Sequence, residues 1–286
     1  MKQTELITNN DGSIFHLHLK PEDIAERIII VGDPGRVEML GGMLSDIRVR
    51  KENREFRTIT GSFEHNEITI LSSGIGTDNI DIVLNELDAL VNIDLKTREV
   101  KEEPRSLSIV RIGTSGSLQA EIPAGASLMT ETAVGFDGLL HFYSGYDWIL
   151  DTALADFLAE HLEWPDVLSY PYAVNASSEL LELFANEGFI KGITISAPGF
   201  YAPQGRRLRL ETFDNEINDK LSTFKFRGRT ISNYEMESSA IYGLSALLGH
   251  KALTVCAIIG NRVTGEFIGD YKPIIRSIAE KVFRNI

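Results

Sequence analysis

The amino-acid sequence predicts an α/β fold in which a central β-sheet is covered by helices on both faces. Short runs rich in Ile and Val alternate with longer segments whose apolar residues recur at helical spacing. Continuous apolar runs are typical of strands buried on both sides, and their alternation with helices is typical of α/β proteins. The predicted strands cover residues 27–32, 67–74, 106–113, 191–197 and 251–260.

Helical patterns lie between and after these strands. Residues 77–91 are the clearest amphipathic helix, with an apolar stripe made of Ile80, Val83, Leu84, Leu87 and Leu90. Residues 240–248 have the pattern of a buried helix, which Gly249 is expected to end. Residues 271–285 form a last amphipathic helix, with Pro273 in its first turn.

The chain of 286 residues is long enough for one large domain or two small ones. Because it contains no internal repeat, low-complexity tract or proline-rich linker, we predict one domain, residues 1–286. Residues 94–106 are the one charge-dense stretch, which we expect to be an exposed helix end and loop.

The formal net charge of −13 argues against nucleic acid or an anionic membrane surface as the main partner. The net charge does not exclude a small anionic ligand, provided that several arginines lie together around it. The single cysteine, Cys256, lies in an apolar run and is expected to fill the core. No run of about 18 apolar residues is present to cross a membrane, and no signal peptide is visible, so we expect a cytoplasmic protein.

Two strand ends carry arginines and glycines. After the first strand come Gly32 and Arg36, and the third strand contains Arg111 and is followed by Thr114. Ligands of open α/β sheets bind at the carboxyl ends of strands, where these residues could form an oxyanion pocket. Two plainer interpretations stay open at this point. Residues 32–36 could be a simple turn, and Arg111 could belong to a structural ion pair.

Three further sites are weak when taken alone. His16 and His18 lie on one side of an extended segment, but no third metal ligand is near them in the sequence. Arg54 reads most simply as a surface charge on an edge strand. Glu235 and Glu237 precede the helix 240–248, and an acid in the first turn of a helix is favoured by the helix dipole alone.

Taken together, the motifs resemble the nucleoside phosphorylases, and within them the uridine phosphorylase branch. The matching stretches span nearly the whole chain in the family's order: "FHLHL", "GDPGR", "NREF", "SSGIG", "RIGTSG", "FYAPQGR", "NYEMES" and "NR" at residues 261–262. The resemblance implies an α/β single domain with a central mixed β-sheet flanked by helices. It also implies a pentosyltransferase that cleaves uridine, or deoxyuridine or thymidine, with inorganic phosphate.

The resemblance also assigns residues to parts of the site. It implies a phosphate site made of Gly32, Arg36, Arg54, Arg111 and Thr114, and ribose contacts from His16, Met236 and Glu237. It implies base contacts from Phe200, Gln204, Arg206 and Arg262. Arg206, Glu237 and Gln204 would carry the catalysis, and Glu235 keeps its interpretation as local structure.

In such a reaction the ribose becomes cationic and the base leaves as an anion, so the enzyme must stabilise charge rather than supply a nucleophile. The resemblance therefore implies no metal and no organic cofactor, with phosphate as co-substrate. It also implies a homo-oligomer, at least a dimer, in which Arg54 and His16 complete the neighbouring site.

Some positions depart from the family pattern. Pro203 replaces a usual glycine and "ISAPGF" replaces a small polar run, and both changes border the pocket that the resemblance implies for the base. Asn79 stands where bacterial members often have a serine near a monovalent cation, so no such ion is predicted. The alternatives are a phosphorylase for a purine or other nucleoside, a nucleosidase that uses water, and a nucleoside-binding protein without turnover.

Overall fold

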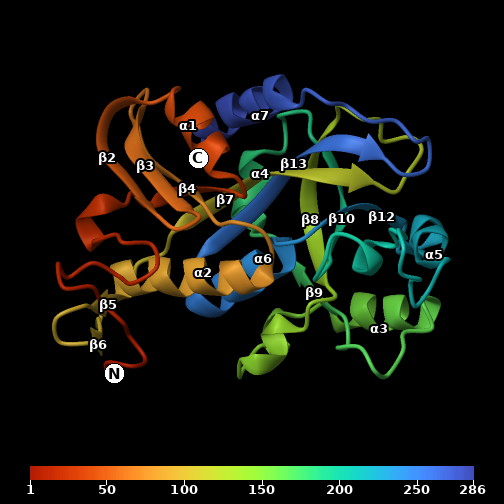
Figure 1. Ribbon diagram of the computed structural model, residues 1–286, viewed down its shortest axis with the longest axis horizontal. Coiled ribbons are helices and arrows are strands. Elements are labelled where there is room, and N and C mark those ends of the chain that lie inside the picture. The colour runs from red at the N-terminus through yellow and green to blue at the C-terminus, as the bar shows by residue number, and fades with distance from the viewer.

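The computed structural model describes all residues, 1–286, and its centre is one large mixed β-sheet (Figure 1). The strands are β1 (Arg27–Val31), β2 (Ser45–Asn53), β3 (Phe56–Phe63), β4 (Asn66–Ser72), β5 (Ile93–Asp94), β6 (Glu99–Val100), β7 (Ser108–Ser117), β8 (Ser127–Gly135), β9 (Tyr172–Asn175), β10 (Ile190–Ser196), β11 (Lys225–Phe226), β12 (Arg229–Glu235) and β13 (Lys251–Asn261). The α-helices are α1 (Pro34–Gly41), α2 (Thr77–Asn92), α3 (Thr152–His161), α4 (Ser178–Leu183), α5 (Ile217–Thr223), α6 (Ser238–Leu248) and α7 (Lys272–Asn285). Short 3₁₀ helices are η1 (Pro21–Asp23), η2 (Leu139–Phe142), η3 (Asp147–Ile149) and η4 (Ala202–Gln204).

The sheet has the order β11-β12-β10-β8-β13-β7-β1-β4-β3-β2, with β9 added beside β8. Strand β1 pairs in parallel with β4 and β7, and β7 pairs in parallel with β13, so their carboxyl ends meet at one edge. Strand β12 also pairs with β7, through Asn233 opposite Ser117 and Tyr234 opposite Gly116. This extra pairing closes β7, β13, β8, β10 and β12 into a ring.

Helices cover both faces of the sheet. Helices α2 and α6 pack against each other below it, while α1 and α7 lie above it in Figure 1. The larger hydrophobic core joins the strands to α2, α6 and α7 through residues such as Ile29, Leu84 and Ile278. A second core under α3 and α5 contains Leu158 and Phe224. The ring of strands is therefore held between two cores.

The predicted elements and the fold class are confirmed. Every predicted strand and helix is present, and α6 ends at Gly249, whose positive φ of 78° is the left-handed conformation that glycine adopts readily. Residues 94–106 differ from the expected helix end and loop. Helix α2 stops at Asn92, and a small exposed hairpin of β5 and β6 follows, because Asp94 Oδ1 accepts hydrogen bonds from the main chain of Lys96 and Thr97 in the turn.

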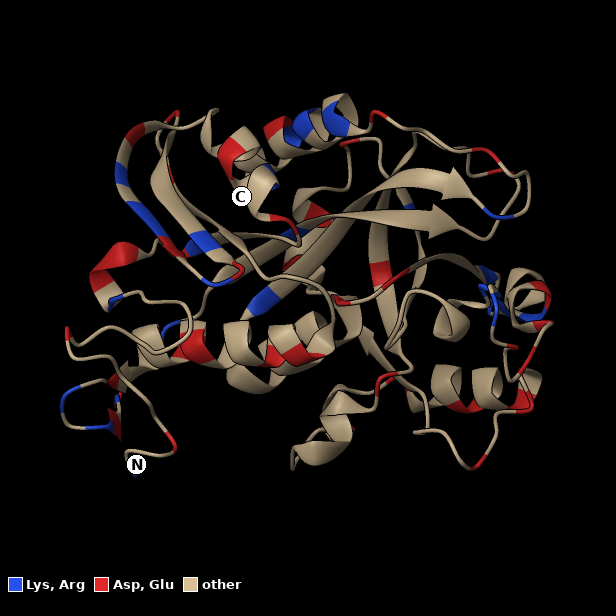
Figure 2. Ribbon diagram, viewed as in Figure 1, with Lys and Arg blue, Asp and Glu red and all other residues tan.

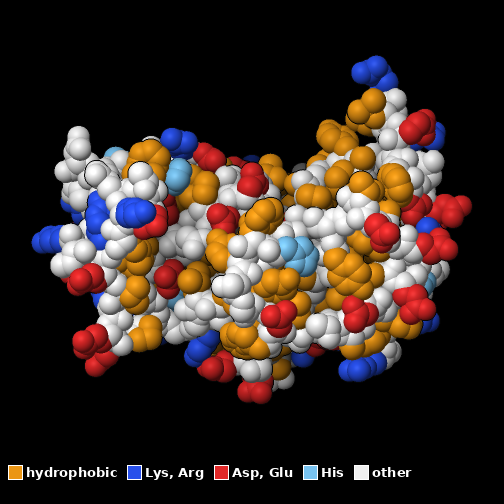
Figure 3. All heavy atoms as spheres, turned by 90° about the horizontal axis from the view of Figure 1, so that it is seen from below, with side chains coloured by type: hydrophobic (Ala, Val, Ile, Leu, Met, Phe, Trp, Pro, Cys, Tyr) orange, Lys and Arg blue, Asp and Glu red, His pale blue; other side chains and the backbone are white.

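The surface mixes charges of both signs. Basic and acidic residues are interleaved along β2 and α7 in Figure 2. Large apolar side chains are exposed on η2, η3 and the loop after α3, among them Phe142, Trp148 and Val167. The face drawn in Figure 3 also carries several apolar clusters. No helix combines the length and the apolar character needed to cross a lipid bilayer.

Candidate active site

A cavity of about 900 Å³ opens where β1, β7, β12 and β13 end. Its wall contains every predicted site residue except Arg54 and His16, namely Gly32, Arg36, Arg111, Thr114, Phe200, Gln204, Arg206, Met236, Glu237 and Arg262. The location agrees with the rule that α/β sheets bind ligands at the carboxyl ends of their strands. Residues distant in sequence thus share one space large enough for a nucleoside and an anion.

Two arginines form one end of the cavity. Arg36 lies in the first turn of α1, and its pKa is lowered by burial and then by the positive charge of Arg111. The Nε atoms of Arg36 and Arg111 are both buried without a hydrogen-bond partner. The absence of a side chain at Gly32 avoids a close contact, because a Cβ at this position would lie 3.3 Å from the carbonyl oxygen of Gly74. Two cations with free donors favour an anion at this end.

Arg111 is held by two carboxylates. Its Nη2 pairs with Glu237 Oε2 at short range, and its Nη1 lies 3.2 Å from Glu235 Oε2. Burial lowers the pKa of Arg111, but the negative charges of Glu237 and Glu235 outweigh this effect and raise it. The guanidinium folds back over its own strand, where a Cβ on Gly113 would lie 2.0 Å from Nη1. Glycine at position 113 is therefore required by the arginine.

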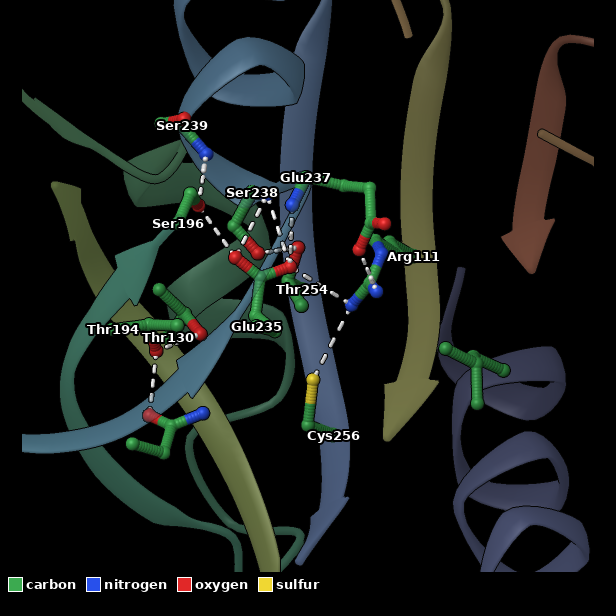
Figure 4. A network of polar contacts seen from close by, with 12 residues as sticks. Arg111, Thr130, Thr194, Ser196, Glu235, Glu237, Ser238, Ser239, Thr254 and Cys256 are labelled. Atoms are coloured by element: carbon green, nitrogen blue, oxygen red, sulfur yellow. Dashed lines mark hydrogen bonds and ion pairs between the residues drawn. The ribbon is translucent and has the colours of Figure 1, made fainter. Parts of the chain in front are cut away.

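The segment from Glu235 to Glu237 joins β12 to α6 and lines the cavity, and Figure 4 shows both of its carboxylates close to Arg111. Glu237 is buried, and its Oε1 accepts from the main-chain N–H of Gly76 at 2.8 Å. Burial raises the pKa of Glu237 above its ordinary value, although the charge of Arg111 opposes this shift. The raised pKa of Arg111 and the hydrogen bond from the N–H of Gly76 both favour the ionised form of the Glu237 carboxylate. We therefore treat Arg111 and Glu237 as a charged pair.

The other end of the cavity is built from the loop after β10 and the end of β13. Gln204 Oε1 accepts from Arg206 Nη1 and from Arg262 Nη2, each at 2.7 Å. The guanidinium of Arg206 lies 3.7 Å from the centre of the Phe200 ring. Burial lowers the pKa of Arg206, and burial followed by the charge of Arg206 lowers that of Arg262 to about 10. No acidic side chain offsets these two cations, so this end favours a ligand that gains negative charge.

Arg54 and His16 lie outside the cavity of their own chain. Arg54 is exposed at the turn between β2 and β3, with its guanidinium 5.8 Å from the centre of the Phe15 ring. His16 Nδ1 lies 2.7 Å from Glu86 Oε1, and the side chain of Asn53 donates to the main-chain oxygen of His16. The two residues thus lie near each other on the surface. His18 is beside Asp11, and no group of His, Cys, Asp and Glu is arranged to hold a metal ion.

Several residues of the cavity wall were not predicted from the sequence. Tyr234 is buried with a hydroxyl that has no partner, and the guanidinium of Arg262 lies 4.8 Å from the centre of its ring. Glu235 also lines the wall, although the sequence assigned it only to local structure. Tyr234 and Glu235 both belong to the "NYEMES" stretch, which the sequence analysis had already singled out. No spacing rule, however, shows which side chains of this stretch reach a cavity.

Comparison with known proteins identifies the family. A model of the "Phosphorylase superfamily" matches residues 26–280. The chain belongs to the phosphorylase superfamily. The resemblance seen in the motifs is thus confirmed, and the strand-end arginines lie within the part of the chain that the superfamily model covers.

Individual members of the superfamily match most of the chain. A uridine phosphorylase of Thermococcus kodakarensis is 29% identical over 260 residues, covering 90% of this chain and 80% of that protein. A uridine phosphorylase of Escherichia coli is 28% identical over 262 residues, covering 89% and 88%. The crystal structure of a Trypanosoma brucei nucleoside phosphorylase that shows uridine phosphorylase activity superimposes with a TM-score of 0.88 and 28% identity, covering 98% of each chain.

Proposed function

We propose that the protein is a uridine phosphorylase, a pentosyltransferase that converts uridine and inorganic phosphate into uracil and ribose 1-phosphate in pyrimidine salvage. The observation that carries the proposal is that one cavity is lined by two separate groups of charged and polar side chains. Arg36 and Arg111 belong to the first group, where Glu237 pairs with Arg111, and Gln204 contacts Arg206 and Arg262 in the second. The sequence similarity to uridine phosphorylases supports the same reaction.

In the proposed reaction, the bond between the base nitrogen N1 and ribose C1′ breaks and both electrons go to uracil. A phosphate oxygen forms the new bond to C1′, and the uracil anion takes up the proton released by phosphate or water. The protein forms no covalent bond. Its task is to hold the reactants and to stabilise the charges that develop.

The phosphate would bind between Arg36 and Arg111, with Gly32 and Thr114 beside it. Arg111 is buried and Arg36 is half-buried, and the Nε atom of each is a buried donor without a partner, so they favour binding of an anion. Each hydrogen bond between a guanidinium and phosphate is worth about 1.5 to 3 kcal/mol. A nucleosidase, which uses water as the acceptor, has no use for this pair of cations.

The ribose would contact Met236 and Glu237, whose carboxylate accepts hydrogen bonds from the sugar hydroxyls. Glu237 also supplies negative potential beside the cationic sugar of the transition state. The same carboxylate pairs with Arg111 in the structure. Binding of phosphate to Arg111 and of ribose to Glu237 would therefore rearrange the ion pair between these two residues.

The base would bind against Phe200, where Gln204, Arg206 and Arg262 contact its polar edge. Because Gln204 Oε1 already accepts from both arginines, its amide nitrogen is left to donate to a carbonyl oxygen of uracil. Arg206 and Arg262 have no carboxylate partner, so their charges stabilise the departing anion.

We propose a homo-oligomer, at least a dimer, in which Arg54 and His16 of a second copy complete each site. Two observations support it. Both residues lie outside their own cavity yet near each other, and large apolar side chains such as Phe142 and Trp148 are exposed on the surface. We further propose that no metal or organic cofactor takes part, and that neither nucleic acid nor a membrane is a partner. A cytoplasmic, reducing location suits a chain whose one cysteine is unpaired.

The first test is the ultraviolet absorbance of uridine incubated with the protein, with and without inorganic phosphate. Release of uracil that depends on phosphate is the expected result. Release without phosphate would indicate a nucleosidase. No release from uridine, but release from another nucleoside in a panel at fixed phosphate, would change the assigned base, and binding without any release would leave a nucleoside-binding protein.

A further inference from the structure

Glu235 is a buried acid to which the proposed reaction gives no contact with substrate. Its Oε1 accepts from the hydroxyl of Ser196 at 2.5 Å, and its Oε2 accepts from the main-chain N–H of Glu237 at 3.0 Å. The same Oε2 lies 3.2 Å from Arg111 Nη1. Figure 4 shows this carboxylate between the end of β12 and the arginine of β7. One side chain thus contacts both the proposed ribose segment and the proposed phosphate arginine.

The first effect of Glu235 is on the start of α6. The first N–H groups of a helix need acceptors, which the side chain of the N-cap residue usually supplies. Here the N-cap residue is Glu237, and its side chain makes no such bond. Glu235 accepts from Ser238 N instead, at 3.0 and 3.1 Å. The main chain from Met236 to Ser238 is therefore fixed, while the carboxylate of Glu237 stays available to the cavity.

The second effect is on Arg111. Its guanidinium is shared between Glu237 and Glu235. When sugar hydroxyls engage Glu237, Glu235 remains as the counter-charge that holds the guanidinium in place. A buried arginine that loses all carboxylate partners is strongly destabilised, so this second partner matters most when both substrates are bound.

We propose that Glu235 is a positioning residue. It holds Met236, Glu237 and Arg111 in fixed positions relative to one another, so that ribose C1′ and the phosphate oxygen come within reacting distance. The inference rests on the proposed phosphorolysis. Reacting atoms must approach to about 3 to 3.5 Å, and a misplacement of about 1 Å costs roughly a hundredfold in rate. Loss of Glu235 therefore lowers turnover more than it weakens the binding of either substrate.

The test is Glu235→Gln, which keeps the side-chain size but places an amide N–H against the donors of Glu237, Ser238 or Arg111. We expect kcat to fall by roughly a hundredfold, while KM for uridine and for phosphate each change by less than about fivefold. Ser196→Ala removes one hydrogen bond to Glu235 but keeps its charge, so a smaller fall in kcat, on the order of tenfold, is expected.

Asp151→Ala is the matched control, because it removes a side-chain cap from another helix. Asp151 Oδ1 accepts from Leu154 N at the start of α3, and Asp151 does not line the cavity. This variant should lower Tm and keep kcat. If Glu235→Gln behaves in the same way, Glu235 is only a helix cap and the inference is wrong. If Glu235→Gln does not fold, the Ser196→Ala variant decides, and an unchanged kcat there overturns the inference.

The two proposals fail differently. If the parent protein releases no uracil with phosphate, the proposed function is wrong, and the positioning role for that reaction is wrong with it. If the parent is active and Glu235→Gln retains its kcat, only the positioning role is wrong.

Discussion

Arg206 is the residue on which the proposed stabilisation of the uracil anion depends most directly. Its Nη1 donates to Gln204 Oε1 and to the main-chain oxygen of Phe200, and its guanidinium covers the Phe200 ring. These contacts fix the cation at the base end without neutralising it. An arginine fixed in this way needs little reorganisation as negative charge develops on the base.

We predict that Arg206→Ala lowers kcat roughly a hundred- to a thousandfold, with KM for phosphate little changed, because the residue acts at the far end of the cavity. Steady-state kinetics with uridine and phosphate measure both constants. Arg207→Ala is the control, since Arg207 is exposed and pairs only with Glu211. Turnover of Arg206→Ala within about fivefold of the parent would contradict the role.

Cys256 is a buried thiol whose Sγ accepts a hydrogen bond from Arg111 Nη1. Burial raises the pKa of Cys256 from 9.0 to about 11, although Arg111 opposes the shift. Between these two pH values the folded protein keeps a proton that the unfolded chain has lost. The stability linked to this thiol is therefore fully present below pH 9 and is lost as pH rises towards 11.

We predict that the free energy of unfolding of the parent falls by about 2 to 3 kcal/mol more between pH 9 and pH 11 than that of Cys256→Ser. Urea unfolding at several pH values measures both slopes. Serine does not titrate in this range and serves as the matched variant. Equal slopes for the two proteins would show that the thiol is not protonated preferentially in the folded state.

At the residue scale, sequence reasoning found the charged groups but not how they pair. The sequence allows either a structural ion pair or an anion site at Arg111, and the structure shows that Arg111 pairs with Glu235 and Glu237 and also lines the cavity. The contacts of Glu235 could not be predicted because its partners, Ser196 and Arg111, come from distant strands. No local pattern carries that information.

At the scale of elements, the two ends of helix α6 have different roles: one end borders the cavity and the other only terminates the helix. Its N-terminus meets the cavity through Glu237, and its C-terminus ends at Gly249, where a Cβ would have no neighbouring atom within 4 Å. The glycine is therefore needed for its positive φ and not for close packing.

We predict that Gly249→Ala destabilises the protein by about 1 kcal/mol and leaves kcat unchanged, because only the left-handed backbone conformation is penalised. Gly249→Asn should cost less, since asparagine tolerates this conformation. Chemical denaturation and uridine kinetics on the three proteins test the separation. A fall in kcat for the alanine variant would mean that the end of α6 is coupled to the site.

The elements themselves were largely predictable because their apolar patterns are strong. The hairpin of β5 and β6 was not, since its strands are short, charged and exposed, and only the turn made by Asp94 specifies it. The pairing of β12 with β7 was also beyond sequence reasoning. It involves two residue pairs more than a hundred positions apart, and no periodicity indicates it.

At the scale of the whole molecule, the positions of Arg54 and His16 distinguish a site formed by one chain from a site shared by two copies of the chain. If each chain formed a complete site alone, these residues would have no function in catalysis. If two copies share sites in a symmetric dimer, Arg54 acts in one site and Glu237 of the same chain acts in the other.

We predict that Arg54→Ala and Glu237→Gln are each inactive alone but regain activity when the two chains are co-expressed. A hybrid dimer contains one native site and one doubly altered site, so random pairing should restore about a quarter of the parent activity. Uracil release by the purified mixture measures it. The control is a co-expression of each variant with itself, and no recovery in the mixture would rule out a shared site.

The ring formed by β7, β13, β8, β10 and β12 also has a kinetic consequence for individual amide protons. Hydrogen exchange at a buried strand requires opening of the structure around it. Tyr234 is buried and lies where the ring closes, so its amide should be among the last to exchange with deuterated solvent. Amides of the exposed loop around Tyr201, which lies outside the ring, should exchange much sooner.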